Sequence, residues 1–206
     1  MKDNIKLVIF DLDGVLVDAC EWHRVALNMS LLEVCNYEIP QKDHYSIFNG
    51  IPTKVKLKKL SEMGILKSSD HKKVYDLKQK HTVDIIEKNA LKREEKIQMI
   101  NRLKSDGIIV ACFTNSIRRT ADLMLRKTGI LDLFDFTLTN EDVQFPKPDP
   151  EGYNFLVNKF DCLPEEVIIV EDSPKGLEAA RASSCNVIQV KSPEEVKYEI
   201  FEEYLK

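Results

Sequence analysis

Long apolar runs, low-complexity segments and paired cysteine motifs are all missing from this chain of 206 residues. No run approaches the roughly 20 apolar residues that a transmembrane helix needs. The first residues lead into a short apolar run rather than a secretory signal. The five cysteines are scattered, and no two form a C-x-x-C pair, so the sequence indicates neither a disulfide framework nor a zinc site. We therefore expect a soluble, reduced, cytoplasmic protein.

A large excess of charge of either sign is also missing. The formal net charge of -4 gives no overall footprint for nucleic acid. The most basic stretch, residues 54–59, is expected to be the solvated side of a helix. A hydrophobic content of 43% supports a real core, and the length suits one large domain or one domain with a small insert. We expect neither a nucleic-acid partner nor a membrane partner.

Short apolar runs that read as strands alternate with helix-like stretches. The strand candidates are residues 6–10, 108–113, 167–170 and 187–190, with a weaker one at 136–139. Apolar residues recur at helical spacing in between, at 92–104, 120–128 and 174–183. This alternation predicts an α/β fold with a parallel sheet and right-handed crossovers.

Residues from about 17 to 90 have a different pattern. They contain no clear strand, and helix-like stretches cover roughly residues 20–35, 53–61 and 70–88. No long Gly/Ser-rich linker marks either end of this region. The sequence therefore predicts a helical insert that follows the first strand.

Polar side chains stand directly after three of the predicted strands. Asp11 and Asp13 follow the first strand, Thr114 follows the second, and Glu171 and Asp172 follow the strand at 167–170. Ligands of open parallel sheets bind outside the carboxyl ends of the strands, so we expect these groups to meet at one edge. Neighbouring acids repel each other, and a hard divalent cation such as Mg²⁺, which takes oxygen ligands, would compensate.

Each of these groups taken alone has a simpler interpretation. Thr114 is typical of a strand end, an acidic pair suits the start of a helix, and Lys147 could be a surface lysine in a Pro-rich loop. In combination and in this order, they resemble the haloacid dehalogenase superfamily over nearly the whole chain. The matching motifs are Asp11-Leu12-Asp13-Gly14-Val15, Thr114 after its strand, Lys147 within residues 145–150, and Glu171-Asp172-Ser173-Pro174.

The resemblance implies both a fold and an activity. The fold would be a Rossmann-like doubly wound parallel sheet core, formed by residues 1–16 and 91–206, with an inserted α-helical cap domain at residues 17–90. The activity would be that of a Mg²⁺-dependent phosphatase that hydrolyses a small phosphorylated metabolite, such as a sugar phosphate. Asp13 argues against a dehalogenase, because a halide leaves without protonation.

The resemblance also assigns roles to residues. Asp11 would be the nucleophile that forms an aspartyl-phosphate, and Asp13 the general acid and then the general base. Thr114 and Lys147 would hold the transferring phosphoryl group. The residues expected to bind substrate are His23, Lys54, Asn115, Ser116 and Arg118, and those expected to bind Mg²⁺ are Asp11, Asp13, Glu171 and Asp172.

The best-fitting subgroup holds β-phosphoglucomutase and phosphoglycolate phosphatase. His23 stands where the mutase has a histidine that helps to close the cap. The mutase cap has two cations for the phosphate that does not react, but Asn49 and Thr53 stand at those positions here, and Lys54 is one position away. Each lost charge-assisted contact is worth about 1.5–3 kcal/mol. This difference favours a phosphatase, with a phosphosugar mutase as the alternative.

Two further alternatives stay open. A phosphonate hydrolase would use a cap lysine as a Schiff base, for which Lys54 is the candidate. A non-catalytic binding protein would keep the fold without the chemistry, but such proteins usually lose the acids that are all present here. The sequence leaves open the particular phosphoester and the oligomeric state.

Overall fold

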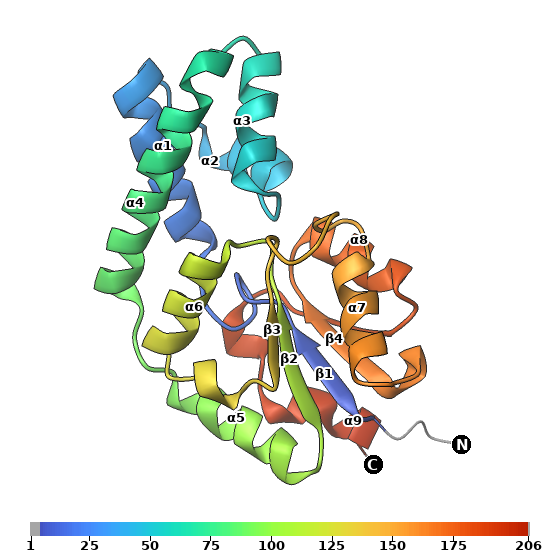
Figure 1. Cartoon of the computed structure of the whole chain (residues 1–206). Helices are drawn as coiled ribbons and strands as arrows, with labels where there is room; N and C mark the ends of the chain where they lie inside the picture. Colours follow the sequence, from blue (N-terminus) through green and yellow to red (C-terminus); the bar gives the residue numbers. More distant parts are fainter. Residues whose placement is uncertain (1–4, 206) are drawn as a thin grey trace. The chain divides into compact units, whose positions relative to one another are not determined.

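The computed structural model describes residues 5–205 of the chain (Figure 1). These residues form two compact units: unit 1 comprises residues 5–18 and 91–205, and unit 2 is Ala19–Ala90. Unit 2 begins after Asp18 and ends at Ala90. The resemblance implied an insert at residues 17–90, so the start differs by two residues and the end is the same. None of the helices in the described part of the chain is both long enough and apolar enough to cross a membrane.

Unit 1 is built on a parallel sheet of five strands in the order β3-β2-β1-β4-β5. The strands are β1 (Leu7–Phe10), β2 (Ile109–Phe113), β3 (Phe136–Leu138), β4 (Val167–Glu171) and β5 (Asn186–Gln189). All five predicted strands are present, and the last begins and ends one residue earlier than predicted. The predicted α/β class with a parallel sheet is therefore confirmed.

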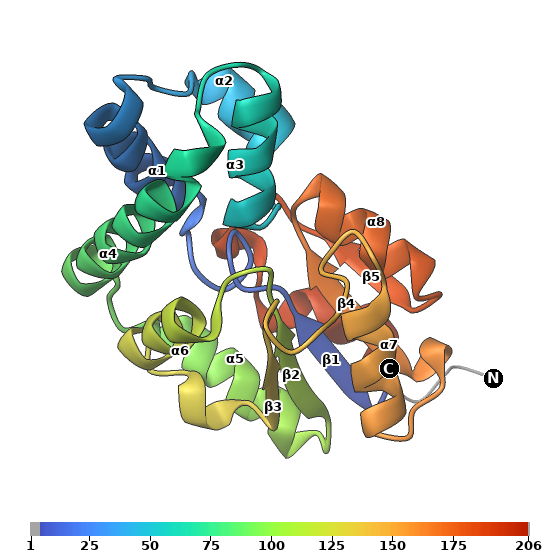
Figure 2. The ribbon, with the colours of Figure 1, turned by 45° about the horizontal axis from the view of Figure 1, so that its top comes forward.

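Helices cover both faces of this sheet, which explains why β1 is completely buried. The helices are α5 (Glu94–Ser105), α6 (Arg118–Lys127), α7 (Glu151–Lys159), α8 (Pro174–Ala182) and the short α9 (Glu202–Leu205). Figure 2 shows α7 and α8 on one side of the sheet and α5 and α6 on the other. Side chains of a strand alternate between the two faces. Leu7 and Ile9 accordingly pack in the core with α7 and α8, while the Phe10 ring lies 5.9 Å from that of Phe201.

The strand register aligns the residues that follow the central strands. Phe10 is level with Cys112 on β2 and with Val170 on β4. Asp11, the next residue, is tied to β4 by a hydrogen bond from its backbone N–H to the carbonyl of Val170 at 3.0 Å. Asp11 and Glu171 are therefore brought to the same level at the carboxyl edge of the sheet.

Every element of unit 2 is helical. Its helices are α1 (Cys20–Cys35), the short α2 (Gln41–Asp43), α3 (Thr53–Glu62) and α4 (His71–Asn89), with a π-helical turn at His44–Phe48 after α2. The three longer helices correspond to the stretches predicted at 20–35, 53–61 and 70–88. The segment at 41–48 was outside those predictions. Their shared core contains Leu27, Leu31, Phe48, Leu57, Leu60 and Val74.

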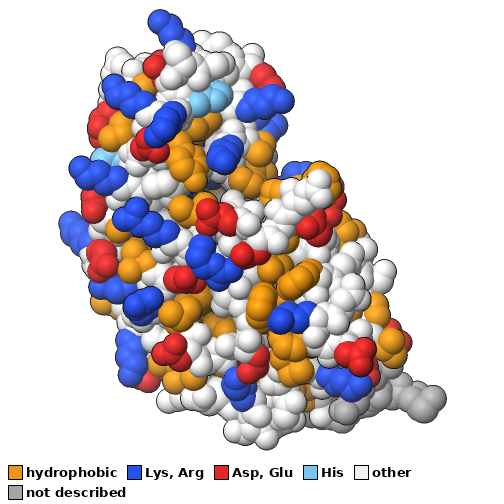
Figure 3. All heavy atoms as spheres, viewed as in Figure 1, with side chains coloured by type: hydrophobic (Ala, Val, Ile, Leu, Met, Phe, Trp, Pro, Cys, Tyr) orange, Lys and Arg blue, Asp and Glu red, His pale blue; other side chains and the backbone are white. Residues whose placement is uncertain are grey.

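The charged surface is mixed in sign. On the face drawn in Figure 3, Lys and Arg side chains alternate with Asp and Glu side chains among the described residues. The basic stretch at 54–59 lies on α3, where Lys54 and Lys58 are exposed as predicted. Lys56 differs from that prediction, because it is buried with only 6% of its surface exposed. One side of this stretch therefore faces the interior of unit 2.

Candidate active site

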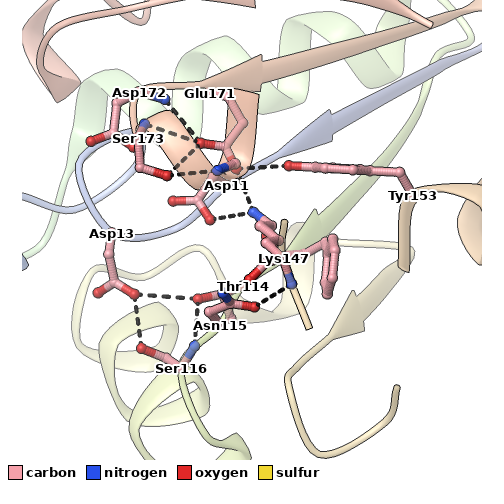
Figure 4. A network of polar contacts seen from close by, with 12 residues as sticks. Asp11, Asp13, Thr114, Asn115, Ser116, Lys147, Tyr153, Glu171, Asp172 and Ser173 are labelled. Carbon is pink, nitrogen blue, oxygen red and sulfur yellow. Dashed lines mark hydrogen bonds and ion pairs between the residues drawn. The ribbon is translucent and has the colours of Figure 1, made fainter. Parts of the chain in front are cut away.

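The carboxyl edge of the sheet gathers the polar residues that the motifs predict (Figure 4). Asp11 follows β1, Thr114 follows β2, Glu171 ends β4, and Lys147 reaches the same place from the loop before α7. All of them belong to unit 1. Residues far apart in the sequence are thus brought together as the motif order predicts.

The Lys147 ammonium lies at the centre of this group. Only 2% of Lys147 is exposed, and its Nζ donates to Asp11 Oδ1 at 2.6 Å, to Glu171 Oε1 at 2.5 Å and to the Phe113 carbonyl at 2.8 Å. Burial lowers the pKa of Lys147, but the negative charges of Asp11 and Glu171 outweigh burial and raise it well above its ordinary value. Lys147 is therefore a buried ammonium whose positive charge is stabilised by Asp11 and Glu171.

Two carboxylates contact this ammonium, and a third lies beside them. Oxygen atoms of Asp11, Glu171 and Asp172 lie within 4.8 Å of one another. Burial raises the pKa of Asp11 well above its usual range, although the Lys147 charge lowers it. Burial also raises the pKa of Asp172, to about 7, and the charge of Glu171 adds to this effect. Full ionisation of all three acids would therefore place more negative charge in this pocket than Lys147 alone can neutralise.

The acidic cluster fits a divalent metal ion. Asp172 Oδ1 is buried and has no hydrogen-bond partner among the described residues. A buried polar atom without a partner carries a large desolvation cost. Carboxylate oxygens are the ligands that hard cations such as Mg²⁺ prefer. Asp11 and Asp172, with Glu171 beside them, therefore have the chemistry of a cation site.

Glu171 is the most heavily hydrogen-bonded of the three acids. Its Oε1 accepts from Lys147 and from the Tyr153 hydroxyl, the latter at 2.8 Å. Its Oε2 accepts from the backbone N–H of Asp172 at 3.0 Å and from the N–H and hydroxyl of Ser173 at 3.3 and 3.4 Å. Ser173 also caps α8 by accepting from Gly176 N–H at 3.0 Å. Glu171 thereby couples the start of α8 to Lys147.

Two glycines make room for the acids. A Cβ atom added at Gly176 would lie 1.9 Å from Glu171 Oε1. A Cβ atom at Gly14 would lie 2.3 Å from Asp172 Oδ2, and the φ of Gly14 is +98°, which disfavours other residues. Gly14 and Gly176 are therefore required by close packing against carboxylates.

Asp13 faces the hydroxyls that follow β2. Its Oδ2 accepts from Thr114 Oγ1 at 3.2 Å and from Ser116 Oγ at 2.8 Å. Asn115 has a different task, because its amide exchanges hydrogen bonds with the backbone N–H and carbonyl of Lys147 at 3.1 and 3.0 Å. The loop after β2 thus holds both Asp13 and the backbone that carries Lys147.

The other predicted substrate-binding residues are Arg118 in unit 1 and His23 and Lys54 in unit 2. The Arg118 guanidinium donates to Asp142 and, at 3.0 Å, to the Thr137 carbonyl. His23 and Lys54 belong to unit 2, where His23 Nδ1 lies 3.1 Å from Lys78 Nζ and Lys54 is exposed on the first turn of α3. Substrate binding by these three residues stays a prediction.

Tyr153 is the residue of this site that the sequence analysis missed. It lies on α7, is fully buried, and packs edge-to-face on the Phe113 ring with centroids 5.0 Å apart. Burial and the charge of Glu171 raise its pKa well above the ordinary value, so it remains a hydroxyl donor. From the sequence alone, a tyrosine at this position is typical of a buried side chain of a helix. Only the fold reveals that its hydroxyl contacts Glu171.

Comparison with known proteins gives this geometry its context. A family model described as haloacid dehalogenase-like hydrolase matches residues 8–190. The chain belongs to this family. The predicted family membership is thereby confirmed, and with it the prediction of a phosphoric monoester hydrolase, since the curated relatives are named as phosphatases.

Three similar proteins illustrate the relationship. A phosphorylated carbohydrates phosphatase of Thermotoga maritima is 30% identical, over 87% of this chain and 82% of that protein. A phosphoglycolate phosphatase of Nitrosospira multiformis is 29% identical, over 90% of this chain and 83% of that protein. The crystal structure of β-phosphoglucomutase from Clostridium difficile superposes with a TM-score of 0.84 at 22% identity, covering 98% of this chain and 97% of that one. At that identity, the last match shows the shared fold alone.

Proposed function

We propose that this protein is a Mg²⁺-dependent phosphatase that hydrolyses a small phosphomonoester through an aspartyl-phosphate on Asp11. The observation that carries this proposal is the pairing of Asp11 Oδ1 with the buried Lys147 ammonium at 2.6 Å, beside two further carboxylates. A carboxylate nucleophile needs nearby positive charge to approach a phosphate dianion. Lys147 supplies that charge within this chain.

In the first half of the reaction, Asp11 attacks phosphorus. Because Lys147 holds Oδ1, Oδ2 is the attacking oxygen. The bond between phosphorus and the ester oxygen breaks, and Asp13 gives its proton to that leaving oxygen. Lys147 balances charge on the transferring phosphoryl oxygens, and Thr114 donates to one of them after leaving Asp13.

In the second half, water replaces Asp11 on phosphorus. Asp13, now ionised, takes a proton from the attacking water, and the bond between phosphorus and Asp11 breaks to release phosphate. The Ser116 hydroxyl orients the Asp13 carboxylate in this step, since it donates to Asp13 Oδ2. Two moderate steps thereby replace one difficult displacement.

A metal ion in this proposal would be held by Asp11, Asp172 and the backbone carbonyl of Asp13, with Glu171 beside them. It would supply positive charge to the phosphoryl oxygens and to the crowded carboxylates. Magnesium is proposed because the available donors are oxygen atoms and the substrate is a phosphate. The unpartnered Oδ1 of Asp172 supports this assignment.

Unit 2 is proposed to act as the cap domain that selects the substrate. It is inserted between the Asp13 motif and the Thr114 motif, and it carries His23 and Lys54. Asn49 and Thr53 stand where a phosphosugar mutase has cations. Without that second phosphate site, hydrolysis is the favoured outcome. Sugar phosphates and phosphoglycolate are the first substrates to consider.

A screen of phosphate release from small phosphomonoesters tests this proposal. It includes sugar phosphates, phosphoglycolate and nucleotides, with and without EDTA. We expect Mg²⁺-dependent release that disappears with EDTA and in Asp11→Asn, but persists in Asp132→Asn, an exposed acid of unit 1. Isomerisation of glucose 1-phosphate without net release would instead establish a mutase. Phosphate release that survives Asp11→Asn would refute the proposed nucleophile.

A further inference from the structure

The Tyr153 hydroxyl has a polar contact that core packing does not require. The ring is already accommodated by the edge-to-face contact with Phe113, at an interplanar angle of 87°. Beside it, Gly152 allows this approach, because a Cβ there would lie 2.2 Å from Phe113 Cζ. The Tyr153 hydroxyl nevertheless donates a hydrogen bond to Glu171 Oε1 at 2.8 Å (Figure 4).

Tyr153 and Lys147 share the same acceptor atom. Lys147 Nζ donates to Glu171 Oε1, and also to Asp11 Oδ1 and the Phe113 carbonyl, so the three donors of the ammonium each have an acceptor. Its Nζ also lies 5.1 Å from the Tyr153 ring centroid. Glu171 therefore competes with Asp11 for the charge of one buried ammonium.

The hydroxyl donor changes that competition. Each hydrogen bond to a carboxylate satisfies part of its negative charge, and in a buried site such bonds are strong. Tyr153 acts on the very oxygen that Lys147 contacts, while Oε2 is served by Asp172 and Ser173. With Oε1 partly satisfied, more of the ammonium charge remains for Asp11 and for an incoming phosphoryl group.

We propose that Tyr153 is a positioning residue that, through Glu171, holds Lys147 toward Asp11 and the transferring phosphoryl group. The proposal rests on the phosphatase function proposed above. Tyr153 stabilises the transition state, in which Lys147 balances the charge on the phosphoryl oxygens. It does not contribute to binding the rest of the substrate. A purely structural hydroxyl would affect stability but not the chemical step.

The test compares Tyr153→Phe with Tyr198→Phe. Both substitutions remove a hydroxyl that donates to a carboxylate, since Tyr198 donates to Asp106 at 2.6 Å on the exposed surface of unit 1. We measure kcat and KM for the best phosphomonoester, thermal melting, and binding of orthovanadate by calorimetry in the presence of Mg²⁺. Orthovanadate imitates the transferring phosphoryl group and reports on the site without turnover.

We expect Tyr153→Phe to lower kcat about tenfold and to weaken orthovanadate binding about tenfold, with KM changed by less than about twofold. Tyr198→Phe should leave all three quantities unchanged. Tyr153→Phe that lowers only the melting temperature would overturn the inference and leave the proposed function intact. Wild-type protein that neither releases phosphate nor binds orthovanadate would overturn the proposed function, and this inference with it.

A double-mutant cycle with Glu171→Gln tests the route of the effect. Because Tyr153 acts through the Glu171 carboxylate, Tyr153→Phe should cost less than about twofold in kcat once Glu171 is already Gln. Losses that multiply in the double variant would show that Tyr153 acts independently of Glu171 and would overturn the inference. Orthovanadate binding, followed in all four proteins, gives the same comparison for any variant that turns over too slowly.

Discussion

Glu171 and Asp172 are neighbours in the sequence but have opposite environments. Both oxygens of Glu171 accept hydrogen bonds from the protein, two on Oε1 and three on Oε2. Asp172 Oδ1 is buried without such a partner among the described residues. Glu171 is therefore held by hydrogen bonds within the protein, whereas Asp172 has an oxygen atom that could bind a cation.

Gly176→Ala tests how closely Glu171 must be held. The added Cβ would lie 1.9 Å from Oε1 and must displace the carboxylate that Lys147 contacts. We expect a stability loss of about 1–3 kcal/mol by urea unfolding, and a fall in kcat of at least about tenfold because Lys147 loses its orientation.

Gly107→Ala is the matched control for that change. Gly107 differs from Gly176, which lies within α8, in having a positive φ of +81°, but no atom lies within 4 Å of a Cβ added at Gly107. We expect a loss of about 1–2 kcal/mol from backbone strain, with kcat retained. If Gly176→Ala kept full activity, close packing around Glu171 would be irrelevant to catalysis.

At the residue scale, the sequence predicted which groups would meet but not how they contact one another. The positions of the strand ends indicated that Asp11, Thr114 and Glu171 share one edge of the sheet. They could not indicate that the Asn115 amide would hold the Lys147 backbone, because that contact joins two loops. The residues around Tyr153 in the sequence predict a buried ring but give no sign of a partner for its hydroxyl. The contact with Glu171 could therefore be found only from the fold.

At the scale of elements, the regular pattern was predictable and the irregular turns were not. The runs that form β1, β2 and β4 are bounded by polar residues, and the sequence identified all three. The helical turns between Gln41 and Phe48 are too short and too irregular to give a helical repeat of apolar residues. Their conformation is set by packing of Phe48 in the core of unit 2.

Lys96 shows how an element is secured by a buried charge. It lies on α5, is completely buried, and donates to the carbonyls of Pro193 and Val196 at 2.5 and 2.6 Å. Burial, with the nearby charge of Arg93, lowers its pKa to about 8. A neutral amine still has two N–H donors, enough for both carbonyls. Lys96 therefore fixes the C-terminal segment to α5 even when deprotonated.

This arrangement predicts a particular pH dependence of stability. Between pH 8 and the ordinary lysine value of 10.5, the unfolded chain binds more protons at Lys96 than the folded chain. The free energy of unfolding of wild type, relative to Lys96→Met, should therefore rise across this interval by up to about 3 kcal/mol. Below pH 8 the difference should be flat. Urea unfolding of both proteins measures it, and parallel pH profiles would contradict the assignment.

At the scale of the whole molecule, the proposed chemistry is concentrated in unit 1. The proposed nucleophile, acid, ammonium and metal ligands all belong to residues 5–18 and 91–205. Unit 2 contributes only the candidates for substrate selection, His23 and Lys54. The sequence could predict the family and the proposed chemistry because the motifs lie at strand ends. It could not predict the substrate, because unit 2 lacks a comparable motif.

The most direct test of this account is to trap the phosphoryl group on Asp11. Asp13→Asn removes the base for the second step, while an aryl phosphate needs no proton for its leaving group, so the covalent intermediate should accumulate. After acid quenching and digestion, mass spectrometry should find one phosphoryl group on the peptide that contains Asp11, and none with EDTA or with Asp11→Asn. Phosphate release without any modified Asp11 peptide would contradict the proposed mechanism.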